Sequence, residues 1–373
     1  MMKQSFIFTR ITLLSAALLM SATGRATPQN SSDAAGKIKA EIERLRTSLK
    51  ENPLQAHGLS EVNTMAQDAL KNADAALSAG NLFSSLESLG SAQDVVQAVR
   101  TFQQKADAVQ TSMPAFETEW KKASLELTAM GEQARARIWS NKPAALQALA
   151  EAAQGRAFPL LDGARGFAVA NGPKDGLFYL GNARGEAETA RFIASLNLAG
   201  KKTSIPLRSM LPELEALQEK TNAAFQPPRS IEMHPRFIAL NSTIKFAREL
   251  DSSKSYAGAL YQYLDAVRHF GMLDPAVPPA DQQAALRARV VDERKKLAAG
   301  KRDDSITEIF LQRASQFLNK PDGAAPSDDE WRAVRVILDQ VLPAYNEALK
   351  PAPPLPQRAR NTATLTLVRW PYT

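Results

Sequence analysis

Residues 174–198 read KDGLFYLGNARGEAETARFIASLNL, and they form the most clearly delimited helix that the sequence predicts. Gly172 and Pro173 end the preceding element of secondary structure, and Asp175 can accept hydrogen bonds from the first free N–H groups of the helix. Gly200 follows the last residues of the helix and is typical of its C-terminal end. Apolar side chains recur along it at close to helical spacing, which makes one face apolar. We therefore expect a central helix that is covered by its neighbours.

Two glycines in this helix predict a close contact with another helix. Gly181 and Gly185 are four residues apart, so they share one face. Each glycine costs about 1 kcal/mol relative to alanine inside a helix. Because a residue without a side chain lets two backbones approach, we expect another helix to pass this face at short range.

The same periodicity extends through most of the chain and predicts an all-α fold, an irregular array or bundle of antiparallel helical hairpins. Gly155, Pro159 and four further glycines interrupt the pattern over residues 155–176, where we expect a short helix between irregular turns. Ser305 with Glu308, and Ser327 with Glu330, predict capping boxes. About a dozen helices are expected in all, the clearest of the others over residues 33–50, 60–79, 82–113, 116–139, 143–155, 208–225, 235–250, 256–272, 282–299, 304–318 and 328–349.

Composition divides the chain into regions. We expect a signal peptide over 1–26, an N-terminal helical region over 27–226, a C-terminal helical region over 229–350, and a Pro-rich spacer with a strand-like tail over 351–373. The two helical regions are either separate domains or one continuous domain.

The first residues have the pattern of an export signal. Lys3 and Arg10 precede an apolar run over residues 11–20, and small residues around Ala26 offer a cleavage site. The run is too short to cross a bilayer, which takes about 20 residues. We therefore expect a periplasmic or secreted protein, cleaved near Ala26, with no transmembrane span in the mature chain.

Cysteine is missing from all 373 residues. A lipid anchor at the cleavage site, disulfides, thiol catalysis and thiolate metal sites are excluded for that reason.

The net charge of +7 belongs to the two ends of the chain. Residues 1–26 and 350–373 contain basic residues and no acidic ones, and the part between them is neutral. A nucleic-acid-binding protein needs a basic face. The charge distribution therefore predicts no nucleic-acid partner.

Small residues in two predicted hairpins produce a resemblance to a known family. Ala259-Leu260-x-x-Tyr263-x-x-Ala266 resembles the second helix of a tetratricopeptide repeat, in which small residues seven apart let the hairpin close. Gly80-Asn81 followed by Ser85, Leu86, Leu89 and Ala92 is similar. The resemblance covers two half-repeats, and the usual Trp-x-x-Leu-Gly first helix is absent from both. It implies helical hairpins that bind a protein or peptide.

Residues with the spacing of a catalytic or metal site are scarce. His57, His234 and His269 are the only histidines, and HExxH and GxSxG motifs are absent, as are nucleotide-binding glycine patterns. Asp265 and His269 could form an i, i+4 pair, either as an oriented imidazole or as a surface hydrogen bond. The acidic pairs at 303–304 and 328–329 are explained by their places at helix starts. We expect no metal and no cofactor.

Aromatic and arginine side chains gather in two places that could form a binding groove. Tyrosine and arginine are enriched in recognition surfaces, although the same residues could serve as core and hairpin edges. The candidate binding residues are Phe178, Tyr179, Arg184, Tyr256, Tyr261, Arg268 and His269.

The C-terminal tail differs from the rest of the chain. A polyproline spacer over 351–356 leads to a stretch in which threonine alternates with apolar residues, as in a strand. Three placements are open: against a groove of its own protein, paired with a strand within 155–176, or added to the sheet edge of a partner. We favour the partner, with contacts from Thr364, Leu365, Thr366, Leu367, Val368, Trp370 and Tyr372.

These observations favour an exported, non-catalytic helical scaffold or protein- or peptide-binding module of the cell envelope. The alternative is a hydrolase that acts on an envelope polymer through carboxylates the motifs do not reveal. A pocket with at least two converging carboxyl groups in unequal environments would favour the hydrolase.

Overall fold

The computed structural model describes residues 28–51, 60–135, 139, 142–198, 202–225, 233–274, 276–320 and 323–351. The expected signal peptide, His57 and all seven candidate residues of the C-terminal tail lie outside these ranges. The helices are α1 (Pro28–Glu51), α2 (Ser60–Ser78), α3 (Leu82–Val109), α4 (Met113–Arg135), α5 (Ala144–Asn171), α6 (Pro173–Ser195), α7 (Leu211–Ala224), α8 (His234–Ser252), α9 (Tyr256–Gly271), α10 (Ala280–Ala299), α11 (Ser305–Leu318) and α12 (Asp328–Val336), which a π-helical turn η3 (Ile337–Val341) joins to α13 (Leu342–Ala348).

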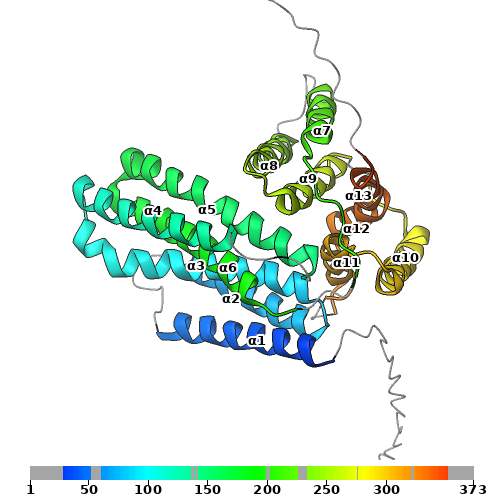
Figure 1. Cartoon of the computed structure of the whole chain (residues 1–373), viewed down its shortest axis with the longest axis horizontal. Coiled ribbons are helices and arrows are strands. Elements are labelled where there is room, and N and C mark those ends of the chain that lie inside the picture. Colours follow the sequence, from blue (N-terminus) through cyan, green and yellow to red (C-terminus); the bar gives the residue numbers. More distant parts are fainter. Residues whose placement is uncertain are drawn as a thin grey trace, which may run out of the picture.

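The all-α class is confirmed for the described part of the chain. Its one β contact is an isolated parallel bridge between Thr203 and Arg302. The long helices α3, α4, α5 and α6 run along the longest dimension of the molecule, and α7 to α13 gather around one end of them (Figure 1). Helix α6 packs on α3, α5 and α4, while α9 packs on α5 and α8.

The close contact predicted at the two glycines of α6 is confirmed, and the helix that passes them is α3. A Cβ built on Gly181 would lie 2.4 Å from the Cα of Ala98, and one on Gly185 would lie 2.5 Å from the Cα of Asp94. Both distances are shorter than any van der Waals contact, so neither position has room for a methyl group.

The expectation of irregular turns over residues 155–176 is wrong, because α5 continues without a break through Pro159 to Asn171. Proline removes one backbone hydrogen bond and usually bends a helix. Here a stripe of small and apolar residues keeps its helical spacing on both sides of the proline and is buried: Ala153, Ala157, Leu161, Ala164 and Ala168. Burial of that stripe outweighs the local preference of the glycines and the proline.

One predicted capping box is confirmed and the other is wrong. Ser327 and Glu330 exchange side-chain and backbone hydrogen bonds at the start of α12. Ser305 instead accepts a hydrogen bond from the backbone N–H of Ala145 at 2.9 Å, and Asp303 accepts one from Ala144 at 2.7 Å. The residues that begin α11 therefore cap the N-terminus of α5.

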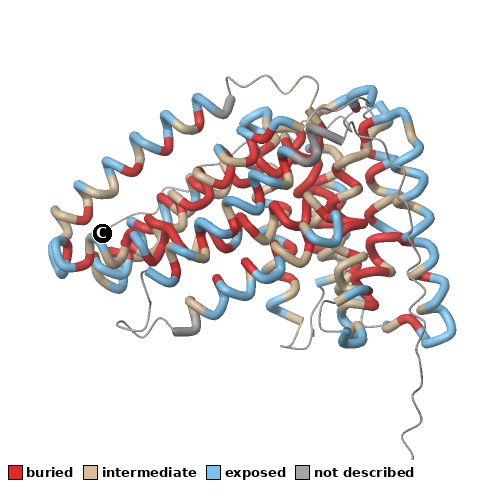
Figure 2. The backbone as a smooth tube through the Cα atoms, turned by 90° about the horizontal axis from the view of Figure 1, so that it is seen from below, coloured by how far each residue is buried: buried red, intermediate tan, exposed pale blue. Residues whose placement is uncertain are grey.

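Buried residues form two hydrophobic clusters. The larger contains residues from every helix of the described structure except α4, so it includes both helical regions that the sequence predicts. The smaller lies between α3, α4, α5 and α6, around Phe116, Leu127 and Leu177. Buried positions line the inner faces of the long helices, and exposed ones lie on their outer faces (Figure 2).

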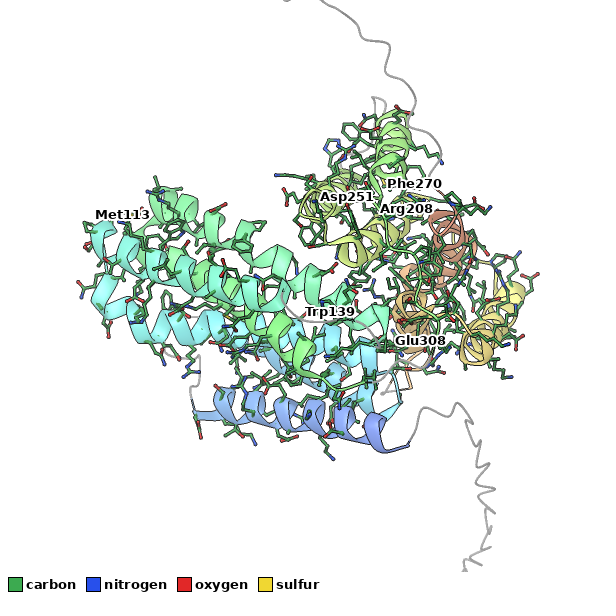
Figure 3. All side chains as sticks on the ribbon, in the orientation of Figure 1. Met113, Trp139, Arg208, Asp251, Phe270 and Glu308 are labelled. Carbon is green, nitrogen blue, oxygen red and sulfur yellow. The ribbon has the colours of Figure 1, made fainter. Side chains whose placement is uncertain are left out.

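Polar contacts attach α7 to the adjacent hairpin. Asp251 at the end of α8 accepts hydrogen bonds from the Ser209 hydroxyl at 2.8 Å and from the Met210 amide at 2.7 Å. Arg208 forms an ion pair with Glu213 at 2.6 Å. Arg208 and Asp251 lie near one another at this junction (Figure 3), where they position the start of α7.

Replacing Gly181 by alanine should destabilise the protein by about 1–3 kcal/mol, because the added methyl group meets backbone atoms of α3 that must move. Gly163 provides the matched control, since a Cβ there would meet nothing within 4 Å. Gly163→Ala should stabilise by roughly 0.5–1 kcal/mol through helix propensity alone. Urea denaturation of both variants measures the effect, and equal shifts would contradict the close contact.

Candidate functional site

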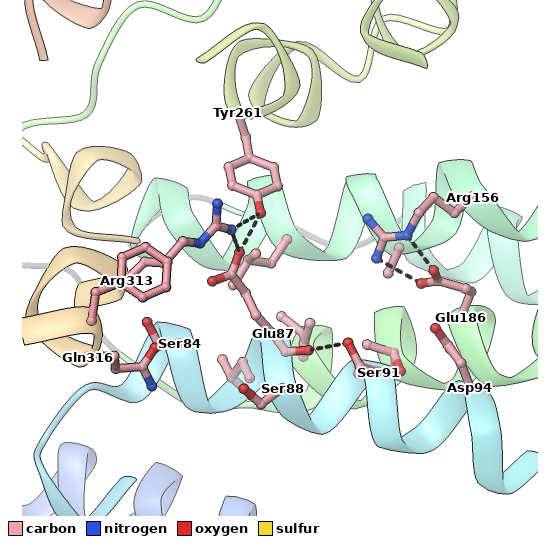
Figure 4. A pocket seen from close by; sticks show the side chains of 17 residues that line it. Ser84, Glu87, Ser88, Ser91, Asp94, Arg156, Glu186, Tyr261, Arg313 and Gln316 are labelled. Atoms are coloured by element: carbon pink, nitrogen blue, oxygen red, sulfur yellow. Dashed lines mark hydrogen bonds and ion pairs between the residues drawn. The ribbon is translucent and has the colours of Figure 1, made fainter. Parts of the chain in front are cut away.

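A cavity of about 460 Å³ lies between α3, α5, α6, α9 and α11, and we call it the central pocket. Its wall on α3 is formed by side chains spaced three or four residues apart, which share one helical face. Figure 4 shows the pocket from close by. Its polar lining consists of Ser84, Glu87, Ser88, Ser91, Asp94, Arg156, Glu186, Thr189, Tyr261, Arg313 and Gln316.

A first ionic cluster joins α3, α9 and α11 at one side of the pocket. Arg313 donates to Glu87 at 2.7 Å and to Asp265 at 3.0 Å. The Tyr261 hydroxyl also donates to Glu87, and burial raises the pKa of that hydroxyl. Burial alone would raise the pKa of Asp265, but Arg268, His269 and Arg313 outweigh it and hold that pKa well below its usual value.

A second ionic cluster lies farther along α3. Arg156 of α5 makes two hydrogen bonds to Glu186 of α6, one of them 2.9 Å long. Asp94 of α3 lies beside Glu186 (Figure 4). Burial, followed by the negative charge of Glu186, raises the pKa of Asp94 well above its usual value, although Arg156 opposes the shift. A carboxyl group in this setting favours its neutral, protonated form.

Three polar atoms of the pocket wall have no hydrogen-bond partner in the described structure. They are the hydroxyl oxygens of Ser84 and Thr189 and the Oδ1 atom of Asp94. Ser84 is only 2% exposed and Thr189 only 6%. Since an unsatisfied buried polar group costs about 1–3 kcal/mol, a polar molecule that hydrogen-bonded to these atoms would remove that cost.

A second cavity of about 530 Å³ lies between α1, α3 and α6. Its Glu188 accepts hydrogen bonds from Gln93 at 2.6 Å and Gln97 at 2.8 Å. Two arginines of its lining, Arg100 and Arg191, are exposed to solvent, where an unpaired cation is well hydrated. None of the residues that line this cavity has a buried polar side-chain atom without a hydrogen-bond partner, in contrast to the central pocket.

The structure places three of the sequence-predicted binding residues at or near the central pocket. Tyr261 lines it. Arg268 donates to Asp265 at 2.8 Å, and the His269 ring lies 3.4 Å from the same carboxylate. Asp265 therefore links both residues to the first ionic cluster, and the predicted Asp265–His269 pair is part of a larger network.

The other four lie elsewhere and are not among the residues that line either cavity. The tilted rings of Tyr179 and Phe167 pack with their centroids 4.4 Å apart, and Phe178 contacts Tyr179 edge-on. Arg184 pairs with Glu126 of α4 at 3.1 Å. Tyr256 is half-buried at the start of α9.

Sequence reasoning missed the acidic and basic residues of the pocket, namely Glu87, Asp94, Arg156, Glu186 and Arg313. One signal for them was present. Glu186 directly follows Gly185 and precedes Ala187, so a charged side chain sits among the small residues of the face that predicted a close contact.

Comparisons of the chain with protein-family models, with curated proteins and with solved structures found no match. Among the helices of the described ranges, none combines the length and the apolar character needed to cross a membrane. Within the same residues, no group of three or more metal-ligating side chains is arranged to hold a metal ion.

Removing an unsatisfied hydroxyl from the pocket should leave stability unchanged or raise it by up to about 1 kcal/mol, because no hydrogen bond is lost. Ser84→Ala and Thr189→Val make this change. Ser85→Ala is the matched control, since the neighbouring Ser85 is fully buried and donates to the Ala73 carbonyl at 2.8 Å. That control should lose about 0.5–1.5 kcal/mol. Chemical denaturation compares the three, and a loss in Ser84→Ala equal to that in Ser85→Ala would contradict the assignment.

The free energy of unfolding of Asp94→Asn, relative to that of the parent protein, should increase as the pH rises from 4 to 8. An acid whose pKa is raised by folding contributes most below the ordinary aspartate pKa, and that contribution is lost as the pH rises through the raised value. The amide of asparagine does not titrate, so it avoids this loss. Denaturation at several pH values measures the trend. Asp107→Asn, on an exposed position of the same helix, is the control, and an identical trend in it would contradict the prediction.

Proposed function

We propose that the protein is an exported, non-catalytic binding module of the cell envelope, and that the central pocket holds its ligand. The observation that carries this proposal is the convergence of three unpartnered polar atoms, on Ser84, Asp94 and Thr189, on one cavity. A binding site needs polar groups whose hydrogen bonds are left for the ligand, and these atoms meet that need.

The walls of the pocket support binding because they are held in place before a ligand arrives. Arg313 is bonded to side chains from α3 and α9, and Arg156 to one from α6. Long side chains that are already ordered lose little further entropy on binding, which favours affinity.

The same contacts argue against catalysis by the pocket carboxylates. Glu87 already accepts from Tyr261 and Arg313, and Glu186 from Arg156, which reduces the ability of either to act as a general base. The residues that line the pocket include serines but no histidine that could activate one.

A hydrolase remains the second candidate, and a specific observation favours it. The pocket brings together Glu87, Asp94 and Glu186 in unequal surroundings, and the pKa of Asp94 is raised by burial and by Glu186, as suits a general acid. Incubation of the protein with an envelope polymer distinguishes the two candidates. A hydrolase releases soluble fragments from an envelope polymer and stops doing so in Asp94→Asn, whereas a binding module releases none.

Export and the kind of partner are part of the proposal. The basic and apolar pattern of residues 1–26 supports export. The tetratricopeptide resemblance supports a protein or peptide partner in addition to the ligand of the central pocket, and the packing is consistent with it: α8 lies against α9, where Ala259 and Ala266 are fully buried. We propose an irregular array of such hairpins, with the tail over 351–373 available for strand addition to a partner.

The absence of cysteine allows a direct test of the pocket. Ser91 lines its mouth and is exposed, so Ser91→Cys creates a single labelling site there. The low-molecular-mass fraction of an envelope extract from the producing cells should slow maleimide labelling of this variant. Mass spectrometry follows the reaction. Ser78→Cys, at the exposed end of α2, is the control and should label at an unchanged rate. Equal rates in Ser91→Cys with and without extract would refute the proposed function.

A further inference from the structure

We propose that the central pocket takes a neutral, hydroxyl-rich ligand of the sugar class. This inference rests on the proposed function, because it assumes that the pocket holds a ligand, and it adds the chemical nature of that ligand.

The first argument is the balance of charge in the pocket wall. Arg156 is paired with Glu186, and Arg313 with Glu87. A cationic ligand would meet these two guanidinium groups, and an anionic ligand would meet the carboxyl groups of Glu87, Asp94 and Glu186. A charged ligand of either sign would lose its hydration on entering the pocket. Next to each side chain that attracted it, a side chain of its own sign would repel it. The wall therefore favours a ligand without net charge.

The second argument is the kind of hydrogen-bonding group that is left over. The hydroxyls of Ser84 and Thr189 are unpartnered, and Ser88 adds a further hydroxyl to the lining. A hydroxyl both donates and accepts. The Oδ1 atom of Asp94 is unpartnered as well, while the same carboxyl group interacts with Glu186. Such hydroxyl groups complement a ligand whose own groups also donate and accept, which describes a polyhydroxyl compound.

The third argument is that apolar side chains lie among these polar groups. Leu149, Ile193 and Phe317 belong to the lining. A sugar ring offers hydroxyls at its edge and C–H groups on its faces, and such faces pack on apolar and aromatic side chains. The volume of about 460 Å³ falls within the range of about 300–1,000 Å³ that is usual for small-molecule sites.

The test compares probes that share one ring and differ in charge. Glucose and N-acetylglucosamine are neutral, glucosamine is a cation and glucuronate is an anion. Isothermal titration of each into the full chain should show saturable binding of at least one neutral sugar, and binding at least about tenfold weaker for both charged sugars. Glucosamine or glucuronate binding more tightly than both neutral sugars would overturn the inference.

Variants locate the binding. Ser84→Ala and Thr189→Val should each weaken binding of the neutral sugar by roughly tenfold, as expected for one lost hydrogen bond. Ser85→Ala, whose hydroxyl contacts Ala73 and not the pocket, should leave the affinity unchanged. Equal affinities in all three variants would place the sugar elsewhere and refute the inference.

The labelling experiment separates failure of this inference from failure of the proposed function. If the envelope extract protects Ser91→Cys but none of the four sugars binds, the ligand class is wrong and the pocket is still a binding site. If the extract gives no protection and no sugar binds, both proposals are wrong.

Discussion

The contact between α3 and α6 is the constraint on which the pocket depends. With no side chains at Gly181 and Gly185, the two backbones come so close that a Cβ on Gly185 would lie 2.5 Å from the Cα of Asp94. Glu186 is the next residue of α6, so the same contact brings its carboxylate to that of Asp94. The raised pKa of Asp94 is therefore a direct result of how closely the helices pack. Any residue larger than glycine would separate the two carboxyl groups.

Polar contacts hold the remaining helices around this pair. Arg313 of α11 reaches Glu87 of α3 and Asp265 of α9, and Arg156 of α5 reaches Glu186 of α6. Removing one member of such a partly buried pair leaves a charge without its partner, which destabilises the protein. The clusters therefore specify a single arrangement of the helices, and the pocket lies where that arrangement leaves hydroxyls without partners.

The fold was largely accessible from the sequence because helix periodicity is a local property. Apolar spacing identified the helices, and Gly181 with Gly185 identified a close contact between two of them. The error at α5 came from treating Pro159 and the neighbouring glycines as breaks, when burial of the alanine stripe kept the helix continuous. The error at Ser305 has a similar origin, since its hydroxyl bonds to a helix far away in the chain.

The site was much less accessible. Tyr261 was identified from its residue type, and Arg268 and His269 as its neighbours on the same helix. Glu87, Asp94, Arg156 and Arg313 look like ordinary solvated charges, and only tertiary packing brings them together. Arg313 and Glu87 are bonded to each other although 226 residues separate them in the sequence. Spacing rules within one helix cannot predict a contact of that range.

The capping of α5 by Asp303 and Ser305 also bears on how the protein folds. Ala144 is bonded to a residue 159 positions later in the chain, and contacts of such long range form slowly, because the intervening loop must first be closed. During synthesis, which proceeds from the N-terminus, the first turn of α5 therefore lacks its hydrogen bonds to Asp303 and Ser305 until α11 has been made. The long helices gain their last hydrogen bonds only after most of the polypeptide is present, which ties completion of the first half of the molecule to the arrival of the second.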